Sequence, residues 1–312
     1  MATMKAARIH DYGGPEVFHY DDIPRPEPKD DELLVRVHAV GVNPADWKIR
    51  SGFTRSMFTL PMPAIVGGDI AGVVEQVGAN ASGFKVGDEV FAMLGLVGAY
   101  AQYVTVKPAL VALKPKSLDF TQAASVPLAA LTAWQALVDN AQVQAGQKVL
   151  IHAASGGVGS FAVQIAKSKG AVVTGTTSAG NAAYVREIGA SDVIDYRSEK
   201  FESRAKDMDV VIDLLGGETG EKSISVLKPG GILVQISGTS EAVQKLAEAA
   251  KVRAVKIMVK PNGEQLREIA KLIDAGKIRT TIAHVFPLSE AGKAQEQSKT
   301  GHTRGKIVMT AV

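Results

Sequence analysis

The stretch VLIHAASGGVGSFAVQIAKSKGAVVTGTTS, residues 149–178, predicts a strand, a glycine-rich turn, a helix and a second strand in succession. Such a turn places the N-terminus of the helix at the carboxyl end of the strand, where free backbone N–H groups and the helix dipole favour a pyrophosphate. Apolar residues after the turn recur at spacings of three and four, as in a helix that packs one face on a sheet: Val158, Phe161, Ala162, Ile165 and Ala166. The stretch therefore predicts a dinucleotide-binding unit.

The turn departs from the usual G-x-G-x-x-G fingerprint at its first position, where Ala154 stands. A tight turn can tolerate a small residue there, while Gly156 lets the backbone approach the phosphates and Gly159 lets the helix lie close to the strand. Taken alone, the glycines would indicate no more than a loop between a strand and a helix. In its context, the turn is expected to contact the cofactor through Ser155, Gly156, Gly157, Val158 and Gly159.

The end of the second strand favours one cofactor over the other. An Asp or Glu there would bind the ribose 2′-hydroxyl of NAD, yet no carboxylate occurs between Gly159 and Glu187. Small hydroxyl side chains that leave room for a 2′-phosphate stand there instead, namely Thr176, Thr177 and Ser178. NADP(H) is therefore predicted. A cation would complete the pocket, but none follows directly, and three could reach it only through the fold: Lys299, Arg304 and Arg186.

The surroundings of the turn support a parallel sheet. Apolar runs alternate with helical patterns, as in a doubly wound α/β fold with helices on both faces of the sheet. The runs span residues 148–153, 171–176, 192–196, 209–215, 231–237 and 252–259. We expect the last run at the sheet edge, where an exposed apolar strand would pair with a second subunit and form a homodimer, unless a loop buries it.

The segments on either side of this region have a different character. Residues 1–115 are β-rich, with Val-rich runs between Gly and Pro. Residues 119–141 and 263–275 favour helix, with Pro127 expected to break the first of these, and 306–312 reads as a strand. The predicted fold class is thus α/β, with a β-rich domain beside the doubly wound one.

Composition excludes several classes of function. The chain has no cysteine, which removes disulfides, thiolate catalysis and cysteine-bearing zinc sites. Its net charge is only +3, with scattered Lys and Arg, so no nucleic-acid footprint is expected. The N-terminus lacks the apolar core of a secretory signal, and no apolar run approaches a bilayer-spanning length. A cytoplasmic setting without membrane contact is the default expectation.

Six segments together resemble the zinc-independent members of the medium-chain dehydrogenase/reductase superfamily, in the quinone oxidoreductase group that includes zeta-crystallin and plant enone and alkenal reductases. The resemblance implies a GroES-like catalytic domain, residues 1–122 and 264–312, around a Rossmann NADP(H)-binding domain, residues 123–263. The segments are GVNPADWKIRSG (41–52), GGDIAGVVEQVG (67–78), GFKVGDEVFA (83–92), HAASGGVGS (152–160), VLKPGGILV (226–234) and GHTRGKIVM (301–309).

The comparison with zinc-dependent relatives implies that no metal is bound. Those relatives have a Cys where this chain has Asn43, and Gly–His–Glu where it reads Gly67–Gly68–Asp69. The four-cysteine structural zinc lobe is also missing. The six histidines show no H-x₃-H spacing, so each is expected to be a surface residue or a satisfied polar residue.

The resemblance also implies catalytic candidates. Asn43 and Asp46 should border the nicotinamide, with Asn43 also contacting the cofactor. Lys48 stands where many quinone reductases have Tyr and where enone-type relatives have Lys; it could stabilise an enolate or hold the ribose, or be an ordinary surface lysine. Trp47 could line an aromatic pocket or belong to the core.

Further cofactor contacts are implied beyond the strand ends. Thr132 should face the nicotinamide, and Ser237 and Gly238 should pack against its edge. Tyr196 should approach the 2′-phosphate or the adenosine, with Lys299 as a candidate for the phosphate. Alternatively, Thr132 serves only for packing or capping, and Tyr196 is only a strand-end aromatic.

These expectations converge on an NADPH-dependent oxidoreductase. Without a metal to polarise a carbonyl, the favoured acceptors delocalise the incoming charge themselves, as quinones and α,β-unsaturated carbonyls do. The alternative is an NADPH-binding sensor or crystallin-like structural protein with little turnover. The dinucleotide unit supports both, and only the residues that border the nicotinamide distinguish them. A nucleic-acid binder is disfavoured, because no patch combines aromatic and basic residues.

Overall fold

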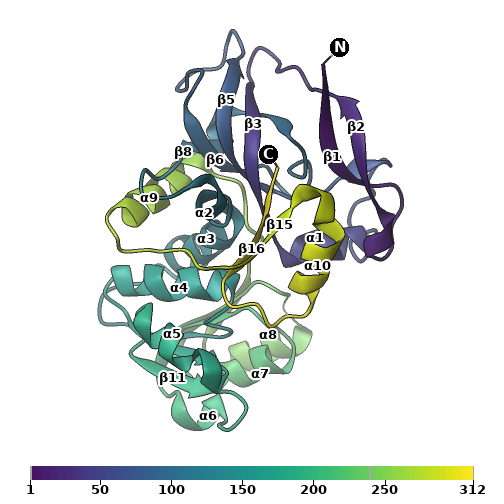
Figure 1. Ribbon diagram of the computed structural model, residues 1–312. Coiled ribbons are helices and arrows are strands. Elements are labelled where there is room, and N and C mark those ends of the chain that lie inside the picture. The colour runs from purple at the N-terminus through teal and green to yellow at the C-terminus, as the bar shows by residue number, and fades with distance from the viewer. Residues whose placement is uncertain (1, 239, 312) are drawn as a thin grey trace. The chain divides into compact units, whose positions relative to one another are not determined.

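The computed structural model describes residues 2–238 and 240–311 and divides into two compact units (Figure 1). The first unit combines the residues up to Leu131 with those from Lys260 onward, and the second is Thr132–Val259. The sequence placed the boundaries after residues 122 and 263. The first observed boundary lies later along the chain, and α2 (Phe120–Ala124), which the predicted boundary would divide, packs against strands of the first unit. In each unit, helices and strands occur together, as the α/β class requires.

A seven-stranded sheet forms the body of the first unit. Its order is β15-β16-β3-β5-β6-β8, with β7 also paired to β3. The bounds are β3 (Leu33–Val42), β5 (Asp69–Val77), β6 (Glu89–Met93), β7 (Tyr103–Val106), β8 (Val111–Leu113), β15 (Ile282–Pro287) and β16 (Lys306–Thr310). Strand β16 was predicted to span 306–312, and of that range residue 312 lies outside the described residues. Because β16 pairs antiparallel with β3, both ends of the chain build one sheet.

A smaller antiparallel sheet has the order β2-β1-β4. Its strands are β1 (Thr3–Ile9), β2 (Phe18–Pro24) and β4 (Ala64–Ile65). Strand β3 is buried along most of its length, which explains its almost continuous run of apolar residues. The core of the unit includes Val35, Val37, Val40, Ile70 and Tyr100.

Short helices complete the first unit. They are α1 (Pro44–Arg50), α2, α9 (Gly263–Asp274) and α10 (Ala291–Lys299). Helix α3 (Pro127–Trp134) crosses the boundary and continues as a π-helical segment, Gln135–Asn140. The break predicted at Pro127 is confirmed, because α2 ends before it and α3 begins at it. Proline lacks the N–H that a helix interior needs but fits the first helical turn.

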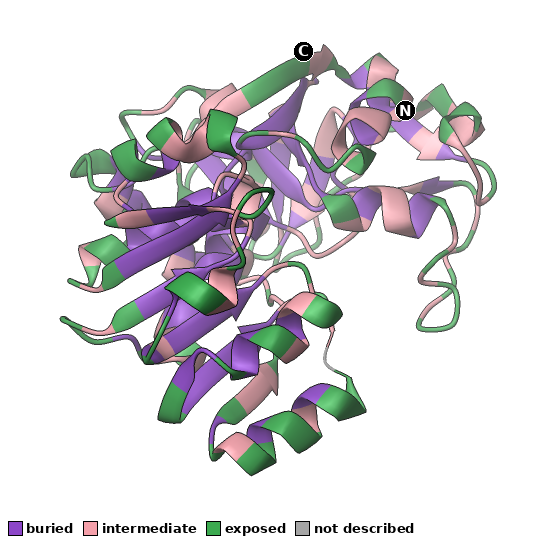
Figure 2. Cartoon of the chain, turned by 90° about the horizontal axis from the view of Figure 1, so that it is seen from below, coloured by how far each residue is buried: buried purple, intermediate pink, exposed green. Residues whose placement is uncertain are grey.

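Six parallel strands form the sheet of the second unit, in the order β11-β10-β9-β12-β13-β14. This is the doubly wound dinucleotide-binding order, and it confirms the predicted Rossmann fold. The strands are β9 (Lys148–Ile151), β10 (Val172–Thr177), β11 (Asp192–Asp195), β12 (Met208–Asp213), β13 (Leu227–Gln235) and β14 (Arg253–Lys256). The helices are α4 (Gly157–Ser168), α5 (Ala182–Glu187), α6 (Phe201–Arg204), α7 (Glu218–Ile224) and α8 (Glu241–Ala250). Figure 2 shows buried residues along the strands and exposed ones on the outer turns of helices.

The predicted edge position of the last strand is confirmed, since β14 ends the sheet order. The strand is shorter than the predicted run of 252–259, and charged residues, Arg253 and Lys256, stand at its two ends. Over the described residues, no helix has both the length and the apolar character that crossing a bilayer requires.

Candidate functional site

The glycine turn of the second unit leads from β9 into α4. Gly156 is the N-cap of α4, and Gly157 and Val158 begin its first turn. No side chain caps this helix end among the described residues, so its first backbone N–H groups are available to an anion. The turn therefore has the local geometry that a pyrophosphate needs.

The close approach predicted for Gly159 is present. A Cβ there would lie 2.2 Å from the carbonyl oxygen of Ala153, which no side chain can tolerate. Ala153 itself adopts a left-handed φ of 51°, so it, and not Ala154, bears the backbone strain of the turn. The methyl group of Ala154 fits because the neighbouring strand has Gly175, whose added Cβ would lie 2.8 Å from it.

The hydroxyl residues at the end of β10 line the same turn. The Thr177 hydroxyl donates to the Ser155 hydroxyl at 2.8 Å. The Thr176 hydroxyl accepts from the Ala153 N–H at 3.3 Å and lies 3.1 Å from Nδ1 of His152. Thr176 and Thr177 are buried and Ser178 is half-buried. Their contacts with a 2′-phosphate stay predictions.

The side chain of His152, at the start of the glycine turn, is held by two hydrogen bonds. Ser223 donates its hydroxyl proton to the carbonyl of Thr219 at 2.7 Å, so it accepts from Nε2 of His152, 3.0 Å away. Nδ1 is then the acceptor for the Thr176 hydroxyl, and these partners assign the neutral Nε2–H tautomer. Burial lowers the pKa of His152 to about 4. The sequence predicted that His152 is a surface residue or a satisfied polar residue; the structure shows it buried, with hydrogen bonds to Thr176 and Ser223.

Asp213 holds a second turn at the carboxyl end of β12. Its Oδ1 accepts from the N–H groups of Leu215 and Gly216, each at 2.9 Å, and its Oδ2 accepts from Gln235 at 3.0 Å. A Cβ on Gly216 would lie 2.7 Å from Oγ of Ser237. Ser237 is exposed, and Gly238 has a φ of 115° that favours glycine. The sequence did not single out Asp213, although a carboxylate that ends an apolar strand was a signal for it.

Tyr196 follows β11 and lies beside the end of β10. Its N–H donates to the carbonyl of Thr177 at 3.2 Å, and its side chain is 56% exposed. The guanidinium of Arg197, which the sequence did not single out, lies 5.8 Å from the Tyr196 ring centroid. Tyr196, Arg197 and the hydroxyl residues therefore occupy adjacent strand ends, where doubly wound folds bind their ligands.

The first unit contains a buried polar cluster that begins at α1. Asn43 is the N-cap, Pro44 is the first helical residue, and Asp46 completes a capping box. Oδ2 of Asp46 accepts from the Asn43 N–H and from the Tyr100 hydroxyl, each at 2.8 Å. Asp46 is fully buried, and its Oδ1 has no partner among the described residues.

Lys306 connects the rest of this cluster. Its ammonium group donates to the carbonyl of Val42 at 3.0 Å and to the side-chain oxygen of Asn43, and it lies 3.8 Å from Oδ2 of Asp69. Asp69 in turn accepts from the Asn43 amide at 2.9 Å and from the Leu128 N–H at 2.8 Å. The sequence missed Lys306, Asp69 and Tyr100 as site residues. A lone lysine at the head of the apolar strand KIVMT was the available signal.

Burial determines the electrostatics of this cluster. It raises the pKa of Asp46 to about 7, raises that of Asp69 and that of Tyr100, and lowers that of Lys306. One ammonium group faces two carboxyl groups, of which Asp46 is half protonated near neutral pH. The cluster therefore approaches electrical neutrality, as a buried group of charges must.

The other predicted residues have different surroundings. Lys48 is half-buried on α1, with its ammonium 5.7 Å from the Trp47 ring centroid. Trp47 is also half-buried, and its indole N–H is buried without a partner in the described structure. Thr132 is buried on α3, and Lys299 is an exposed residue near Glu296 at the end of α10. Their catalytic or cofactor roles stay predictions.

Two family descriptions match the chain. Residues 29–116 match the alcohol dehydrogenase GroES-like domain, and residues 188–309 match the zinc-binding dehydrogenase family. The first lies in the unit built from both chain ends, and the second begins within the Rossmann unit.

Individual relatives are similar over nearly the whole chain. The quinone oxidoreductase of Pongo abelii is 37% identical over 98% of this chain and 97% of its own length. The chloroplastic NADPH-dependent alkenal/one oxidoreductase of Arabidopsis thaliana is 35% identical over 98% of this chain and 79% of its own length. The crystal structure of Escherichia coli quinone oxidoreductase complexed with NADPH has a TM-score of 0.88 and 30% identity, covering 98% of this chain and 99% of that one. The chain therefore belongs to the quinone oxidoreductase group of the medium-chain dehydrogenase/reductase superfamily and is an oxidoreductase.

Proposed function

We propose that this chain uses NADPH to reduce quinones or α,β-unsaturated carbonyl compounds, such as enones and alkenals, without a catalytic metal. The observation that carries the proposal is the hydrogen bond and ion-pair cluster of Lys306, Asn43 and Asp69. Within it, Asn43 stands where zinc-dependent relatives have a Cys, and Asp69 stands where they have a Glu. The names of the relatives support quinones and alkenals as acceptors.

The residues at these positions do not fit zinc. Asn43 stands where a Cys would stand. Its side-chain oxygen accepts a hydrogen bond from Lys306, and its side-chain N–H donates one to Asp69. A Cβ on Gly68, where a His would stand, would lie 2.0 Å from the carbonyl oxygen of Gly95, so no side chain can be accommodated there. A zinc site needs three protein ligands of the N, O or S type, and two of the expected ones are lost.

The cofactor proposal rests on the second unit. The uncapped N-terminus of α4 suits the pyrophosphate of a dinucleotide. The end of β10 has hydroxyl groups and no carboxylate, which favours the 2′-phosphate of NADPH. Arg197, beside Tyr196, is a candidate cation for that phosphate, in addition to Lys299. NADPH in the related Escherichia coli structure supports the same choice.

The chemistry follows from the lack of a Lewis acid. NADPH would transfer a hydride to the β-carbon of an enone, the electrons would move onto the carbonyl oxygen, and the α-carbon would then take a proton from water. A quinone would accept the hydride and a proton to give the hydroquinone. Because the acceptor delocalises the charge, hydrogen-bond donors suffice to assist it. Lys48 and the unpartnered indole N–H of Trp47 are the candidate donors on α1.

Asn43 and Asp46 would act differently from Lys48. Both are buried, and Oδ2 of Asp46 and the side-chain amide of Asn43 are hydrogen-bonded to protein groups. We therefore propose that Asp46 is a positioning residue, which holds the start of α1 through its hydrogen bonds and so sets the direction of Lys48. Asn43 would link this capping box to Lys306.

The test measures the loss of NADPH absorbance by chelator-treated protein. A quinone, a 2-alkenal, a cyclic enone and a saturated aldehyde would be compared, with NADH as the alternative donor. We expect oxidation of NADPH with the first three acceptors, little with the saturated aldehyde, and weaker activity with NADH. Activity that disappears on chelation and returns with Zn²⁺ would contradict the metal-free proposal. Tight NADPH binding without oxidation by any acceptor would favour the sensor or structural protein.

We also propose a homodimer, on the grounds that β14 leaves one edge of the Rossmann sheet unpaired. Light scattering should then give twice the chain mass of 32.8 kDa. A Val255→Lys variant should shift the mass toward that of one chain. A mass of one chain for the unchanged protein would refute the dimer.

A further inference from the structure

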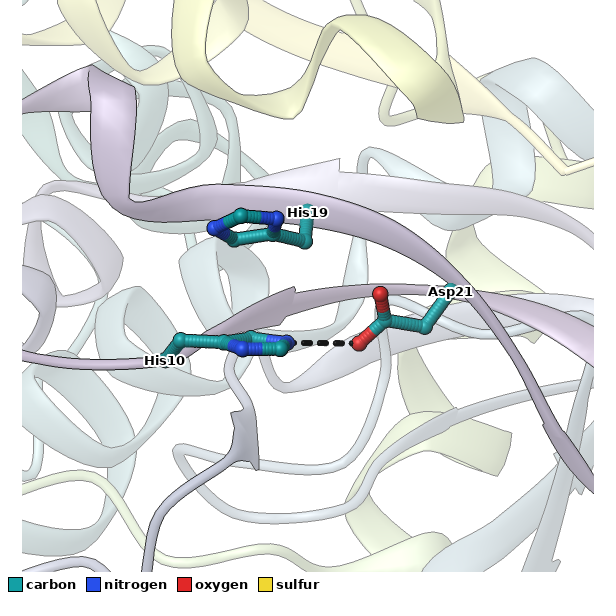
Figure 3. Close-up of side chains that lie close together, drawn as sticks. All are labelled: His10, His19 and Asp21. Atoms are coloured by element: carbon teal, nitrogen blue, oxygen red, sulfur yellow. Dashed lines mark hydrogen bonds and ion pairs between the residues drawn. The ribbon is translucent and has the colours of Figure 1, made fainter.

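Three metal-ligating side chains gather on the β1–β2 hairpin of the first unit (Figure 3). His10 directly follows β1, whereas His19 and Asp21 stand two residues apart on β2 and so point to the same face. Nε2 of His10 lies 2.7 Å from Oδ2 of Asp21, and the His10 and His19 ring centroids are 4.1 Å apart. One donor atom from each residue lies within 4.8 Å of the others.

We propose that His10, His19 and Asp21 bind one divalent transition-metal ion of the Zn²⁺, Ni²⁺ or Cu²⁺ type. Two imidazole nitrogens and one carboxylate oxygen form a ligand set that these ions prefer over Mg²⁺ or Ca²⁺. Metal–ligand bonds of about 2.0–2.2 Å require the donors to approach one another to roughly 3.5 Å. The two histidines are exposed and Asp21 is only partly covered, so side-chain rotation can supply this contraction.

The backbone already brings the ligands together. Strands β1 and β2 pair in one register from Thr3 opposite Pro24 to Ile9 opposite Phe18. The N–H of His10 donates to the carbonyl of Val17 at 3.1 Å, which extends this pairing to His10 itself. A metal would therefore find its three ligands on a preformed hairpin and would need no change of fold.

The charges around the site are mixed. The hydrogen bond from His10, together with the neighbouring cations, keeps the pKa of Asp21 below its ordinary value, so Asp21 is ionised at neutral pH. Arg8 opposes the metal, because its guanidinium lies 3.4 Å from the same Asp21 oxygen. We therefore expect micromolar binding and not the tighter affinity of a closed structural site, on the order of 10⁻⁶ M.

A surface ion pair is the competing explanation of this cluster. In that case His10 and Asp21 interact only with each other, and His19 merely stacks on the His10 ring. The two explanations differ in what they require of His19, because an ion pair can dispense with it and a three-ligand metal site cannot. His19 is therefore the decisive position.

The test is calorimetric titration of the full, untagged, chelator-treated chain with ZnCl₂. We expect one ion per chain with micromolar affinity at about pH 7.5 and much weaker binding at about pH 5.5, where protons compete for imidazole. His19→Asn and Asp21→Asn should each weaken binding by at least about tenfold. His302→Asn is the matched control, since His302 is equally exposed but lies outside the cluster, and it should leave binding unchanged.

Several results would overturn this proposal. They are the absence of binding, equal binding by His19→Asn, or loss of binding by His302→Asn. Thermal unfolding of each variant checks that it is folded, and the electron paramagnetic resonance of added Cu²⁺ should show two coordinating nitrogens that fall to one in His19→Asn. NADPH oxidation is not part of the readout, so the result stands apart from the catalytic proposal. Zinc found at this hairpin would thus not contradict metal-free catalysis.

Discussion

Lys306 is a cation enclosed by protein oxygens. It contacts the Val42 carbonyl, the Asn43 side chain and, at a longer distance, Asp69, and all of these groups are buried. A buried ammonium is tolerated only where such partners replace its hydration. The same contacts join Asn43 on one side and Asp69 on the other through one buried ammonium group.

Replacing Lys306 by Met should destabilise the protein strongly. Asp69 would keep a buried charge without its counter-ion, which costs about 3 kcal/mol or more. Urea denaturation measures this change in the free energy of unfolding. Lys299→Met, which alters an exposed lysine 4.0 Å from Glu296, is the control and should stay within about 0.5 kcal/mol. Equal stability of the two variants would refute the role of the buried cation.

The buried carboxyl group of Asp46 should make the stability of the folded protein depend on pH. Burial raises its pKa from 3.8 to about 7, so the folded state holds a proton that the unfolded state releases between these values. This contribution is fully present below about pH 4 and is lost as the pH rises through 7. Asp46→Asn keeps an oxygen acceptor and does not titrate.

The Asn variant should therefore gain stability relative to the unchanged protein as the pH rises from 4 to 7. The gain is roughly 3–4 kcal/mol, because the pKa shift from 3.8 to about 7 spans about three units and each unit corresponds to about 1.4 kcal/mol. Urea denaturation at a series of pH values measures the difference between the two proteins. A difference that does not vary with pH would show that Asp46 is not perturbed in this way.

At the scale of elements, the junction of β9, β10 and α7 depends on a neutral imidazole. His152 accepts from Thr176 on β10 and donates to Ser223 on α7. Protonating Nδ1 would remove the acceptor that the Thr176 hydroxyl needs. Burial lowers the pKa of His152 and outweighs the opposing charges of Asp213 and Glu202, so His152 stays uncharged.

His152 predicts a pH dependence opposite to that of Asp46. Its pKa falls from 6.5 to about 4 on folding, so its contribution is fully present above pH 6.5 and is lost as the pH falls through 4. Relative to His152→Asn, the unchanged protein should lose on the order of 2 kcal/mol across this window. Guanidinium unfolding at several pH values checks this, with His284→Asn as an exposed control. A constant difference between protein and variant would contradict the assigned protonation state.

At the scale of the whole molecule, the first unit depends on both ends of the chain. Strand β16 lies between β15 and β3, and it carries Lys306. The seven-stranded sheet is therefore incomplete until β16 has paired with β15 and β3. This connectivity makes the C-terminal strand a structural part of the N-terminal half.

Removing residues 306–312 should therefore prevent the first unit from folding. The deletion takes away no residue of the second unit, so the six-stranded sheet of that unit should still form. Limited proteolysis of the truncated chain should release a protected fragment close to Thr132–Val259. The full chain under the same conditions is the control. A truncated chain that resists proteolysis throughout, like the full chain, would show that β16 is dispensable.

Local patterns in the sequence were sufficient for much of the fold. The six parallel strands, the helix break at Pro127 and the close approach at Gly159 depend on residue type and spacing within a few turns of chain. These features could be predicted because residue type and spacing within a short segment determine its backbone conformation and which of its side chains face the core. The boundaries were less accurate, as the shorter β14 shows, because strands end where hydrogen-bond partners end.

Only the tertiary structure decided the composition of the polar clusters. Lys306 and Asn43 stand 263 residues apart and meet because β16 pairs with β3. The spacing of the histidines along the chain indicated no metal ligands, yet a hairpin brings His10 and His19 together. The sequence by itself thus determined the dinucleotide fold and its cofactor preference, through local pattern. Which charges are buried together depended on long-range strand pairing, which no local pattern records.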